Sequence, residues 1–259
     1  MGMPRIATRE EWLAERKALL AKEKALTRAR DALAAERRAL PWVRVEKDYA
    51  FDGPDGPVSL ADLFAGRSQL VVYHFMFGPD WQEGCVGCSF LADHVDGARQ
   101  HFEQNDVSFV AVSRAPFAKI DAFRRRMGWR FRWVSAAGSD FNFDYSVSFT
   151  PERKLDGKVL YNFETIDDPG TDELPGISVF AQDETGAIFH TYSSYARGGE
   201  PHLGAYAYLD LVPKGRNEHV RGNLGDWVRH HDRYGAAGHV DPTGRFQAEP
   251  EGECPACRG

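Results

Sequence analysis

Between Thr8 and Leu40 the apolar positions follow a heptad pattern that is typical of a long amphipathic helix. The heptad positions are Trp12, Leu19, Leu26, Leu33 and Leu40. The segment contains no glycine or proline, Pro41 follows it, and Thr8 with Glu11 has the spacing of a capping box. We therefore predict a helical region at residues 1–41. Its narrow apolar stripe either packs along its own domain or joins two copies of the chain in a homodimer.

Apolar runs and amphipathic segments alternate through residues 42–214. Three β-prone apolar runs predict buried strands, and two segments with helical spacing lie between them. The strands are expected at 68–77, 107–113 and 130–135, and the helices at 89–104 and 117–129. This strand–helix–strand–helix–strand order implies parallel pairing with right-handed crossovers.

The segments on either side of this core complete the predicted sheet. Residues 43–51 have strand character, and residues 176–195 predict an antiparallel hairpin that turns at Asp183–Gly186. The polar and aromatic segment 140–175 predicts an inserted loop, and 202–212 predicts a closing helix. The fold class is therefore α/β, with a central sheet, flanking helices and a long N-terminal helix in addition.

Composition and charge limit the cellular location and the classes of binding partner that we expect for this chain. Apolar residues make up 42% of the chain, enough for a large core, and the net charge of -6 argues against a nucleic-acid-binding protein. The longest apolar run, LVVYHFMF, falls far short of the roughly 18 residues that cross a membrane. The first residues have no apolar segment of a secretory signal. We predict a cytoplasmic protein without nucleic-acid or membrane partners.

The main candidate for chemistry is the stretch GPDWQEGCVGCSF, which holds Cys85 and Cys88 in a C-x-x-C spacing. It lies between a predicted buried strand and the start of a predicted helix. Unpaired backbone N–H groups and the helix dipole favour an anion there, so a cysteine at this place should have a lowered pKa. Attack by Cys85 followed by resolution by Cys88 is the exchange chemistry that suits this arrangement.

Other readings of the two thiols remain open. Soft thiolates also bind copper or zinc, but a structural zinc site needs four ligands. The second C-x-x-C pair, Cys254 and Cys257, follows Cys88 after 165 residues, in a predicted loosely ordered tail at 215–259. We therefore predict no metal site and no cofactor. Two further alternatives are that the cysteines are inert small residues, or that the chain is a binding scaffold that acts through its N-terminal helix.

Further candidate residues surround the thiols in the predicted fold. Trp81 precedes them in the same loop, and Arg114 follows a predicted strand at the sheet edge where sites gather. Pro175 directly precedes the hairpin, where it would shape a substrate groove. Tyr195 and Arg197, with Tyr192, form a polar aromatic group after the hairpin. We predict these positions as substrate contacts, with packing or surface ion pairing as the alternative for each.

The chain also resembles known families in these motifs. The element order, the C-x-x-C after a strand and the proline before the hairpin resemble the thioredoxin superfamily, and residues 49–75 resemble peroxiredoxin-like members. The motifs PWVRVEKDY, YHFMFGPDW, GCVGCSF, AVSRAP, MGWRFRWVS, GSDFNFDY and YSSYARG are similar to an uncharacterised bacterial family, domain of unknown function 899. That resemblance covers about residues 5–235 and implies a thioredoxin-like, peroxiredoxin-related domain at 42–214 and a dithiol–disulfide oxidoreductase.

Two departures separate the chain from the better-known members. Peroxiredoxins carry P-x-x-x-T-x-x-C, whereas Gly78 and Gln82 stand at the corresponding places here, which puts the alternative of a thiol peroxidase in doubt. Val86 and Gly87 replace the Gly-Pro dipeptide of thioredoxin, so the redox potential does not carry over. The expected substrate is a thiol or disulfide, either of a protein or of a small molecule.

Overall fold

The computed structural model describes residues 5–154, 156–218 and 227–248, and it has two compact units, divided after Trp42. Cys254 and Cys257 lie outside the described residues. The described helices include none that is both long and apolar enough to cross a membrane.

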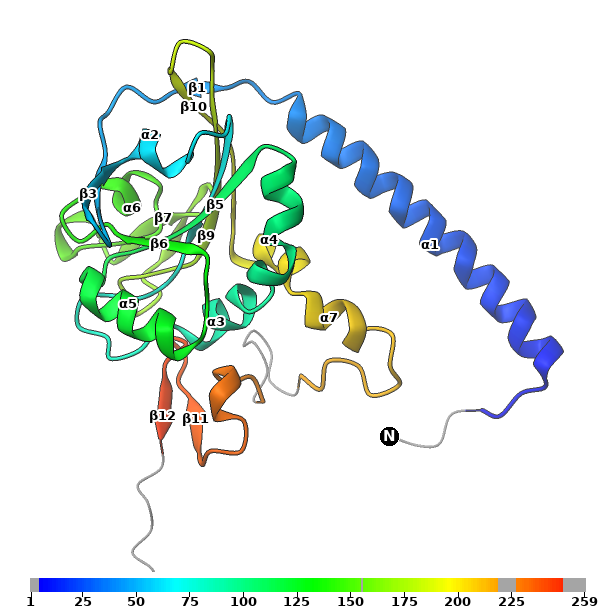
Figure 1. Cartoon of the computed structure of the whole chain (residues 1–259). Helices are drawn as coiled ribbons and strands as arrows, with labels where there is room; N and C mark the ends of the chain where they lie inside the picture. Colours follow the sequence, from blue (N-terminus) through cyan, green and yellow to red (C-terminus); the bar gives the residue numbers. More distant parts are fainter. Residues whose placement is uncertain (1–4, 155, 219–226, 249–259) are drawn as a thin grey trace, which may run out of the picture. The chain divides into compact units, whose positions relative to one another are not determined.

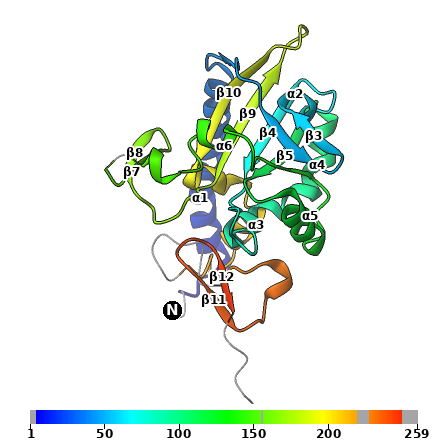
Figure 2. The same cartoon turned by 90° about the vertical axis from the view of Figure 1, so that its left-hand side faces the viewer.

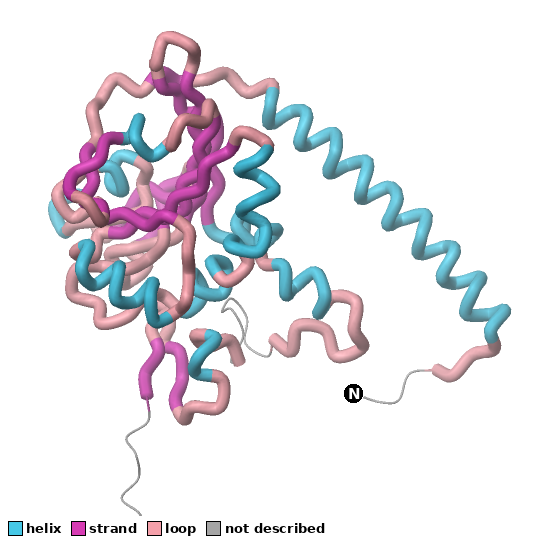
Figure 3. The backbone as a smooth tube through the Cα atoms, viewed as in Figure 1, coloured by secondary structure: helices cyan, strands magenta, loops and turns pink. Residues whose placement is uncertain are grey.

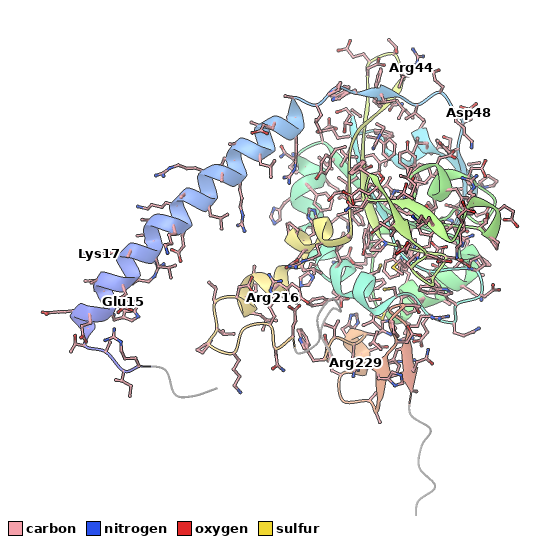
Figure 4. All side chains as sticks on the ribbon, turned by 180° about the vertical axis from the view of Figure 1, so that it is seen from behind. Glu15, Lys17, Arg44, Asp48, Arg216 and Arg229 are labelled. Atoms are coloured by element: carbon pink, nitrogen blue, oxygen red, sulfur yellow. The ribbon has the colours of Figure 1, made fainter. Side chains whose placement is uncertain are left out.

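The first unit holds the long helix α1 (Arg9–Arg38), as predicted. Its start is fixed by the predicted capping box: the Glu11 N–H donates to Thr8 Oγ1 at 3.2 Å, and the Thr8 N–H donates to Glu11 Oε2 at 2.8 Å. None of the 30 residues of α1 is buried, and its four heptad residues are between 47% and 53% exposed. Figure 4 labels Glu15 and Lys17 on this helix. Among the described residues of the first unit, none buries the apolar stripe of α1.

The second unit is built on an eight-stranded sheet in the order β1-β10-β9-β4-β5-β6-β2-β3 (Figure 1). Its strands are β1 (Val43–Arg44), β2 (Ala50–Gly53), β3 (Gly56–Ser59), β4 (Gln69–His74), β5 (Val107–Ser113), β6 (Arg132–Ser135), β9 (Gly176–Gln182) and β10 (Ile188–Tyr195). Two separate pairs are β7 (Lys158–Tyr161) with β8 (Glu164–Asp167), and β11 (Gly238–Val240) with β12 (Phe246–Ala248).

Helices and short 3₁₀ turns connect these strands (Figure 3). The α-helices are α2 (Leu60–Leu63), α3 (Val86–Ala92), α4 (Val95–Gln104), α5 (Phe117–Arg126), α6 (Phe141–Asp144) and α7 (Gly204–Leu209). The 3₁₀ turns are η1 (Pro151–Arg153), η2 (Ala196–His202) and η3 (His231–Arg233).

The pairing at the centre of the sheet confirms the predicted fold class. Strands β4, β5 and β6 are parallel, β9 pairs antiparallel with β4, and β10 pairs antiparallel with β9. The order β10-β9-β4-β5, in which β9 alone runs opposite to the other three strands, is that of a thioredoxin-like sheet. The predicted hairpin at 176–195 is β9 and β10, and it turns at the predicted residues.

Alternation along β4 divides the core into two layers. Tyr73 and the following Phe75 pack with α3 and α5, whereas Leu70 and Val72 face α2 and α6. His74 lies in the second layer, with Nδ1 3.2 Å from Asn142 Oδ1 and Nε2 2.9 Å from Ser178 Oγ. Burial lowers the pKa of His74 to about 4, so it is a neutral, hydrogen-bonded core residue.

Two predicted elements are each split in the structure. The helix expected at 89–104 is α3 and α4, separated at Asp93 and His94. There His94 Nδ1 contacts the Phe90 carbonyl at 2.8 Å, and its Nε2 accepts the Ala205 N–H at 2.9 Å, which ties the break to α7. The strand expected at 43–51 is divided between β1 and β2, which pair at opposite sides of the sheet.

Segment 227–248 packs beside α3, close to the loop that carries the cysteines. Figures 1 and 2 both place β11 and β12 next to α3. His230 is fully buried, with Nε2 2.9 Å from the Gly84 carbonyl oxygen, and the Val86 N–H donates to the Gly244 carbonyl oxygen at 2.8 Å. These described residues of the expected tail therefore belong to the folded body around the thiols.

Candidate functional site

Cys85 is the N-cap residue of α3 and is held there by its backbone. Its N–H donates to the Met76 carbonyl at 3.0 Å, and its own carbonyl accepts the N–H and the hydroxyl of Ser89, both at 2.9 Å. The sulfur faces the first turn of the helix. Hydrogen bonds from the Cys88 thiol and from the N–H groups of Cys88 and Gly87 lower the pKa of Cys85 despite its burial.

Cys88 lies one turn further along α3 and has the opposite electrostatic setting. Its sulfur accepts the Met76 N–H at 3.4 Å and also forms a hydrogen bond with the Tyr73 hydroxyl. Burial, followed by the hydrogen bond with Cys85 and the charge of that thiolate, raises the pKa of Cys88 well above its usual range. The pair therefore consists of one thiol poised to ionise and one that keeps its proton.

Both thiols are free, and they line a cavity of about 680 Å³. Cys85 is 5% exposed and Cys88 is 2% exposed, so a substrate reaches them through this cavity. Apolar walls come from β4, α3 and the segment before β9, and the mouth is formed by η2, α7 and nearby residues. The cavity has the size of a small-molecule site.

Pro175, which the sequence predicts as a groove residue, lines the same cavity as the thiols. Its peptide bond is trans. Its carbonyl oxygen accepts the Tyr161 hydroxyl at 2.7 Å, and that hydroxyl in turn accepts the Ala196 N–H at 2.8 Å. Tyr161, which the sequence did not single out, thus fixes the segment before β9 to the start of η2.

Charged groups at the mouth of the cavity are paired with one another. Arg197, predicted as a substrate contact, lines the mouth with an 87% exposed side chain, and its Nη2 lies 2.7 Å from Glu200 Oε2. Arg216, labelled in Figure 4, pairs with Glu200 and with Asp210, whose Oδ1 is 2.7 Å from Nε. Both arginines in the described lining therefore already have carboxylate partners.

Three predicted site residues lie outside the cavity lining. Trp81 is buried in the core and has the Arg245 guanidinium 5.3 Å from its ring. Arg114 forms an ion pair with the buried Glu173. Tyr195 donates to the Tyr145 carbonyl at 3.1 Å.

The C-terminal hairpin, formed by β11, β12 and the turn between them, supplies a site residue that the sequence analysis did not identify. Gly244, at φ +87°, leaves its open side against Cys85, where an added Cβ would lie 2.6 Å from Sγ. The motif Asp241-Pro242-Thr243-Gly244 carried a signal for this turn, because aspartate and proline start turns and glycine adopts positive φ.

A charged network attaches this hairpin to the cysteine loop. Arg126 Nη1 is 2.6 Å from Glu83 Oε1, and its Nε is 2.8 Å from Asp232 Oδ2. Arg233 also pairs with Glu83. His230 lies among these groups, and burial lowers its pKa, so it stays neutral and donates Nε2–H to Gly84.

Metal binding is an alternative use of the two thiols. Within residues 5–154, 156–218 and 227–248, no group of three or more His, Cys, Asp or Glu side chains is arranged to hold a metal ion.

Comparisons with known proteins place the chain in one family. A family model described as "Bacterial protein of unknown function (DUF899)" matches residues 1–234. No curated protein matches the chain.

Solved structures with similar folds include several peroxiredoxins. Peroxidoxin BcpB from Mycobacterium tuberculosis is 16% identical, with 64% of this chain and 93% of that chain covered and a TM-score of 0.42. A mutant of peroxiredoxin Q from Xanthomonas campestris is 16% identical, with 65% and 95% covered and a TM-score of 0.40. The mitochondrial 2-Cys peroxiredoxin from Plasmodium falciparum is 13% identical, with 65% and 94% covered and a TM-score of 0.37. The thioredoxin-like fold of the chain follows from its own strand order and pairing.

Proposed function

The chain belongs to the bacterial family DUF899, and from its own geometry we propose that it is a thiol–disulfide oxidoreductase. Cys85 is the nucleophile and Cys88 the resolving thiol. The observation that supports this proposal most directly is the opposite direction of the two pKa shifts at neighbouring sulfurs. An attacking thiol must be ionised, whereas a resolving thiol must wait until the first bond has formed.

The exchange proceeds in two displacements. The Cys85 thiolate attacks one sulfur of a substrate disulfide, forms a mixed disulfide and releases the other sulfur as a thiolate. Cys88 then loses its proton, which the leaving thiolate takes up, and attacks Cys85 Sγ. The second substrate sulfur leaves, so one disulfide is reduced to two thiols while Cys85 and Cys88 are oxidised to a disulfide. A dithiol reductant then reduces the Cys85–Cys88 disulfide by two further displacements and is itself oxidised to a disulfide, with no cofactor.

Neighbouring residues support each step. The N–H groups of Gly87 and Cys88 stabilise the Cys85 thiolate before attack and whenever it leaves. The Tyr73 hydroxyl supports the thiolate that forms on Cys88. Pro175 and the segment that Tyr161 fixes form the wall against which the substrate lies.

Trapping of the mixed disulfide tests the proposal. Cys88→Ser should accumulate a mixed disulfide on Cys85 when a disulfide substrate is added, and Cys85→Ser should accumulate none, as read by intact and peptide mass spectrometry. The double variant Cys254→Ser/Cys257→Ser is the matched control, because it removes the other C-x-x-C and should still form the Cys85–Cys88 disulfide. Equal adduct formation in Cys85→Ser and Cys88→Ser would reject the assignment.

The same variants separate this reaction from its two alternatives at these cysteines. A copper or zinc protein would carry stoichiometric metal that Cys85→Ser loses. A peroxiredoxin-like peroxidase would oxidise Cys85 with hydrogen peroxide far faster than with any disulfide. Gly78 and Gln82, at the places of the peroxiredoxin proline and threonine, favour the disulfide reaction.

The N-terminal helix supports a proposal about assembly. Its apolar stripe of Trp12, Leu19, Leu26 and Leu33 has the heptad spacing of a coiled coil. We propose that α1 pairs with α1 of a second copy in a homodimer. The location is proposed to be the cytoplasm, where reducing conditions keep thiols free for exchange.

A further inference from the structure

We propose that the C-terminal hairpin restricts this site to small, largely uncharged disulfides, which enter through the cavity, and excludes the disulfides of folded proteins. The proposal rests on the proposed exchange reaction and names the substrate class of the same site. It assigns Gly244 as a residue that determines specificity.

The first reason is that the hairpin tip covers one side of Cys85, where Pro242, Thr243 and Gly244 form part of the cavity wall. An added Cβ at Gly244 would lie 2.6 Å from Sγ, so this backbone packs beside the sulfur with no room for a side chain between them. The Val86 N–H, on the first residue of α3, donates to the Gly244 carbonyl at 2.8 Å. A protein disulfide that approaches from this side meets backbone instead of sulfur.

The second reason is that the hairpin is held at several points. His230 anchors its base to Gly84, Arg126 links Glu83 to Asp232, and Arg245 lies over the Trp81 ring. Within the turn, the Asp241 carboxylate accepts the Thr243 N–H at 2.9 Å and the Arg245 N–H at 3.1 Å. The tip is therefore a fixed wall of the site.

The third reason is the chemistry of the remaining entrance. Tyr73, Met76, Leu91, Ile177 and Leu203 give the cavity an apolar lining. Both arginines at its mouth already have carboxylate partners, and the Glu218 carboxylate accepts the Tyr206 hydroxyl at 2.8 Å. The two arginines therefore offer no unpaired positive charge to an anionic ligand, so recognition depends on size and apolar contact.

Labelling with probes of two sizes tests access without any catalysis. Reduced protein is treated with N-ethylmaleimide or with a maleimide linked to a long polymer, and modification of Cys85 is followed by peptide mass mapping. The ratio of the two rates cancels any change in the thiolate fraction. Relative to a free cysteine peptide, Cys85 should discriminate against the large probe by at least about tenfold, the lower end of what pocket shape provides. A ratio equal to that of the peptide overturns the proposal.

Two variants should open the cover. Gly244→Ala places a methyl group against Sγ at a φ that alanine avoids, so the tip must move away. Val86→Pro removes the N–H that holds the tip, at the first helical position, where proline is favoured. Both should raise the relative rate of the large probe. Gly235→Ala is the matched control, because it introduces similar backbone strain, at φ +100° in the same segment, with nothing within 4 Å, and it should leave the relative rate of the large probe unchanged.

Disulfide substrates test the class directly. Rates of Cys85–Cys88 oxidation are measured with bis(2-hydroxyethyl) disulfide, glutathione disulfide and insulin, each relative to the free peptide. The relative rate with bis(2-hydroxyethyl) disulfide should exceed the rates with glutathione disulfide and insulin by about tenfold or more. Gly199→Leu places a side chain beside Leu91 in the cavity and should slow the first substrate, whereas Gly97→Leu, exposed on α4, should not. Insulin reacting as fast as the small disulfide overturns the proposal. Size-selective labelling without reaction with any disulfide would reject the exchange function instead.

Discussion

The Val86 N–H donates to the Gly244 carbonyl oxygen across 2.8 Å and joins the tip of a C-terminal hairpin to the first turn of the helix that carries both thiols. This bond uses one of the N–H groups that a helix start leaves unpaired. The N–H groups of Gly87 and Cys88 point instead to the Cys85 sulfur. The helix start thus stabilises the thiolate with two donors and positions its cover with a third.

The thiol of Cys88 is the largest influence that lowers the pKa of Cys85, which predicts the effect of its removal. Cys88→Ala should raise the apparent pKa of Cys85 and slow its alkylation by iodoacetamide at pH 7 severalfold, because the side-chain donor is lost. Cys88→Ser, which keeps a hydroxyl donor, should change the rate less. Alkylation rates across pH with peptide mapping measure both. An unchanged profile in Cys88→Ala would show that the backbone donors alone set the ionisation.

The buried His230 predicts a pH-dependent attachment of the hairpin. Its lowered pKa means that the unfolded chain takes up a proton before the folded chain does, so stability falls as pH drops below about 6.5 toward the folded value. His230→Phe should remove this dependence, and the loss of the bond to Gly84 should cost about 1–3 kcal/mol at pH 7.5.

Urea denaturation at pH 7.5 and pH 5.5 measures both effects of His230→Phe. The groups that face this ring are Glu83, Arg126, Asp232 and Arg233, and they remain in the variant. His239→Phe, exposed on β11, is the control and should change stability by less than about 0.5 kcal/mol. A wild-type slope that persists in His230→Phe would assign the pH dependence to the neighbouring carboxylates.

Local sequence patterns were enough to predict the central strands of the sheet and the position of Cys85. Both depend on residues that are close in sequence. The apolar runs determine β4 and β5, and the loop between strand and helix places Cys85 at the N-cap. Trp81 and Arg114 lie near the thiols in sequence or topology, yet their partners, Arg245 and Glu173, come from distant segments. Such long-range pairings leave no periodic pattern, and for the same reason the contact of Gly244 with Cys85 was not predicted.

Glu173, which directly precedes the cavity-lining residues Leu174 and Pro175, makes the stability of the fold depend on pH. Burial raises its pKa to about 7, although Arg114 and the Ser148 hydroxyl, 2.9 Å away, favour its charged form. The folded chain therefore holds a proton that the unfolded chain loses near pH 4.5, and stability falls as pH rises toward 7. Relative to Glu173→Gln, the wild type should lose up to about 3 kcal/mol over this range.

Urea denaturation of the wild type and of Glu173→Gln at several pH values between 4.5 and 7.5 measures the difference between their free energies of unfolding. Carboxylates that both proteins share contribute equally and do not affect this difference. Glu164→Gln, exposed on β8, is the control and should run parallel to the wild type. A constant difference between wild type and Glu173→Gln would mean that Arg114 keeps the carboxylate ionised throughout.

The stripe on α1 predicts the oligomeric state. Leu19→Asp/Leu26→Asp places two charges in the apolar seam of a coiled coil and should convert the dimer to a monomer, as measured by sedimentation velocity across a concentration series. Lys17→Asp/Lys24→Asp is the matched control, because both lysines lie two residues before the leucines, on the opposite side of the helix. It should remain a dimer. A wild type that is monomeric at every concentration, or a dimer that survives in Leu19→Asp/Leu26→Asp, would show that α1 does not join two copies.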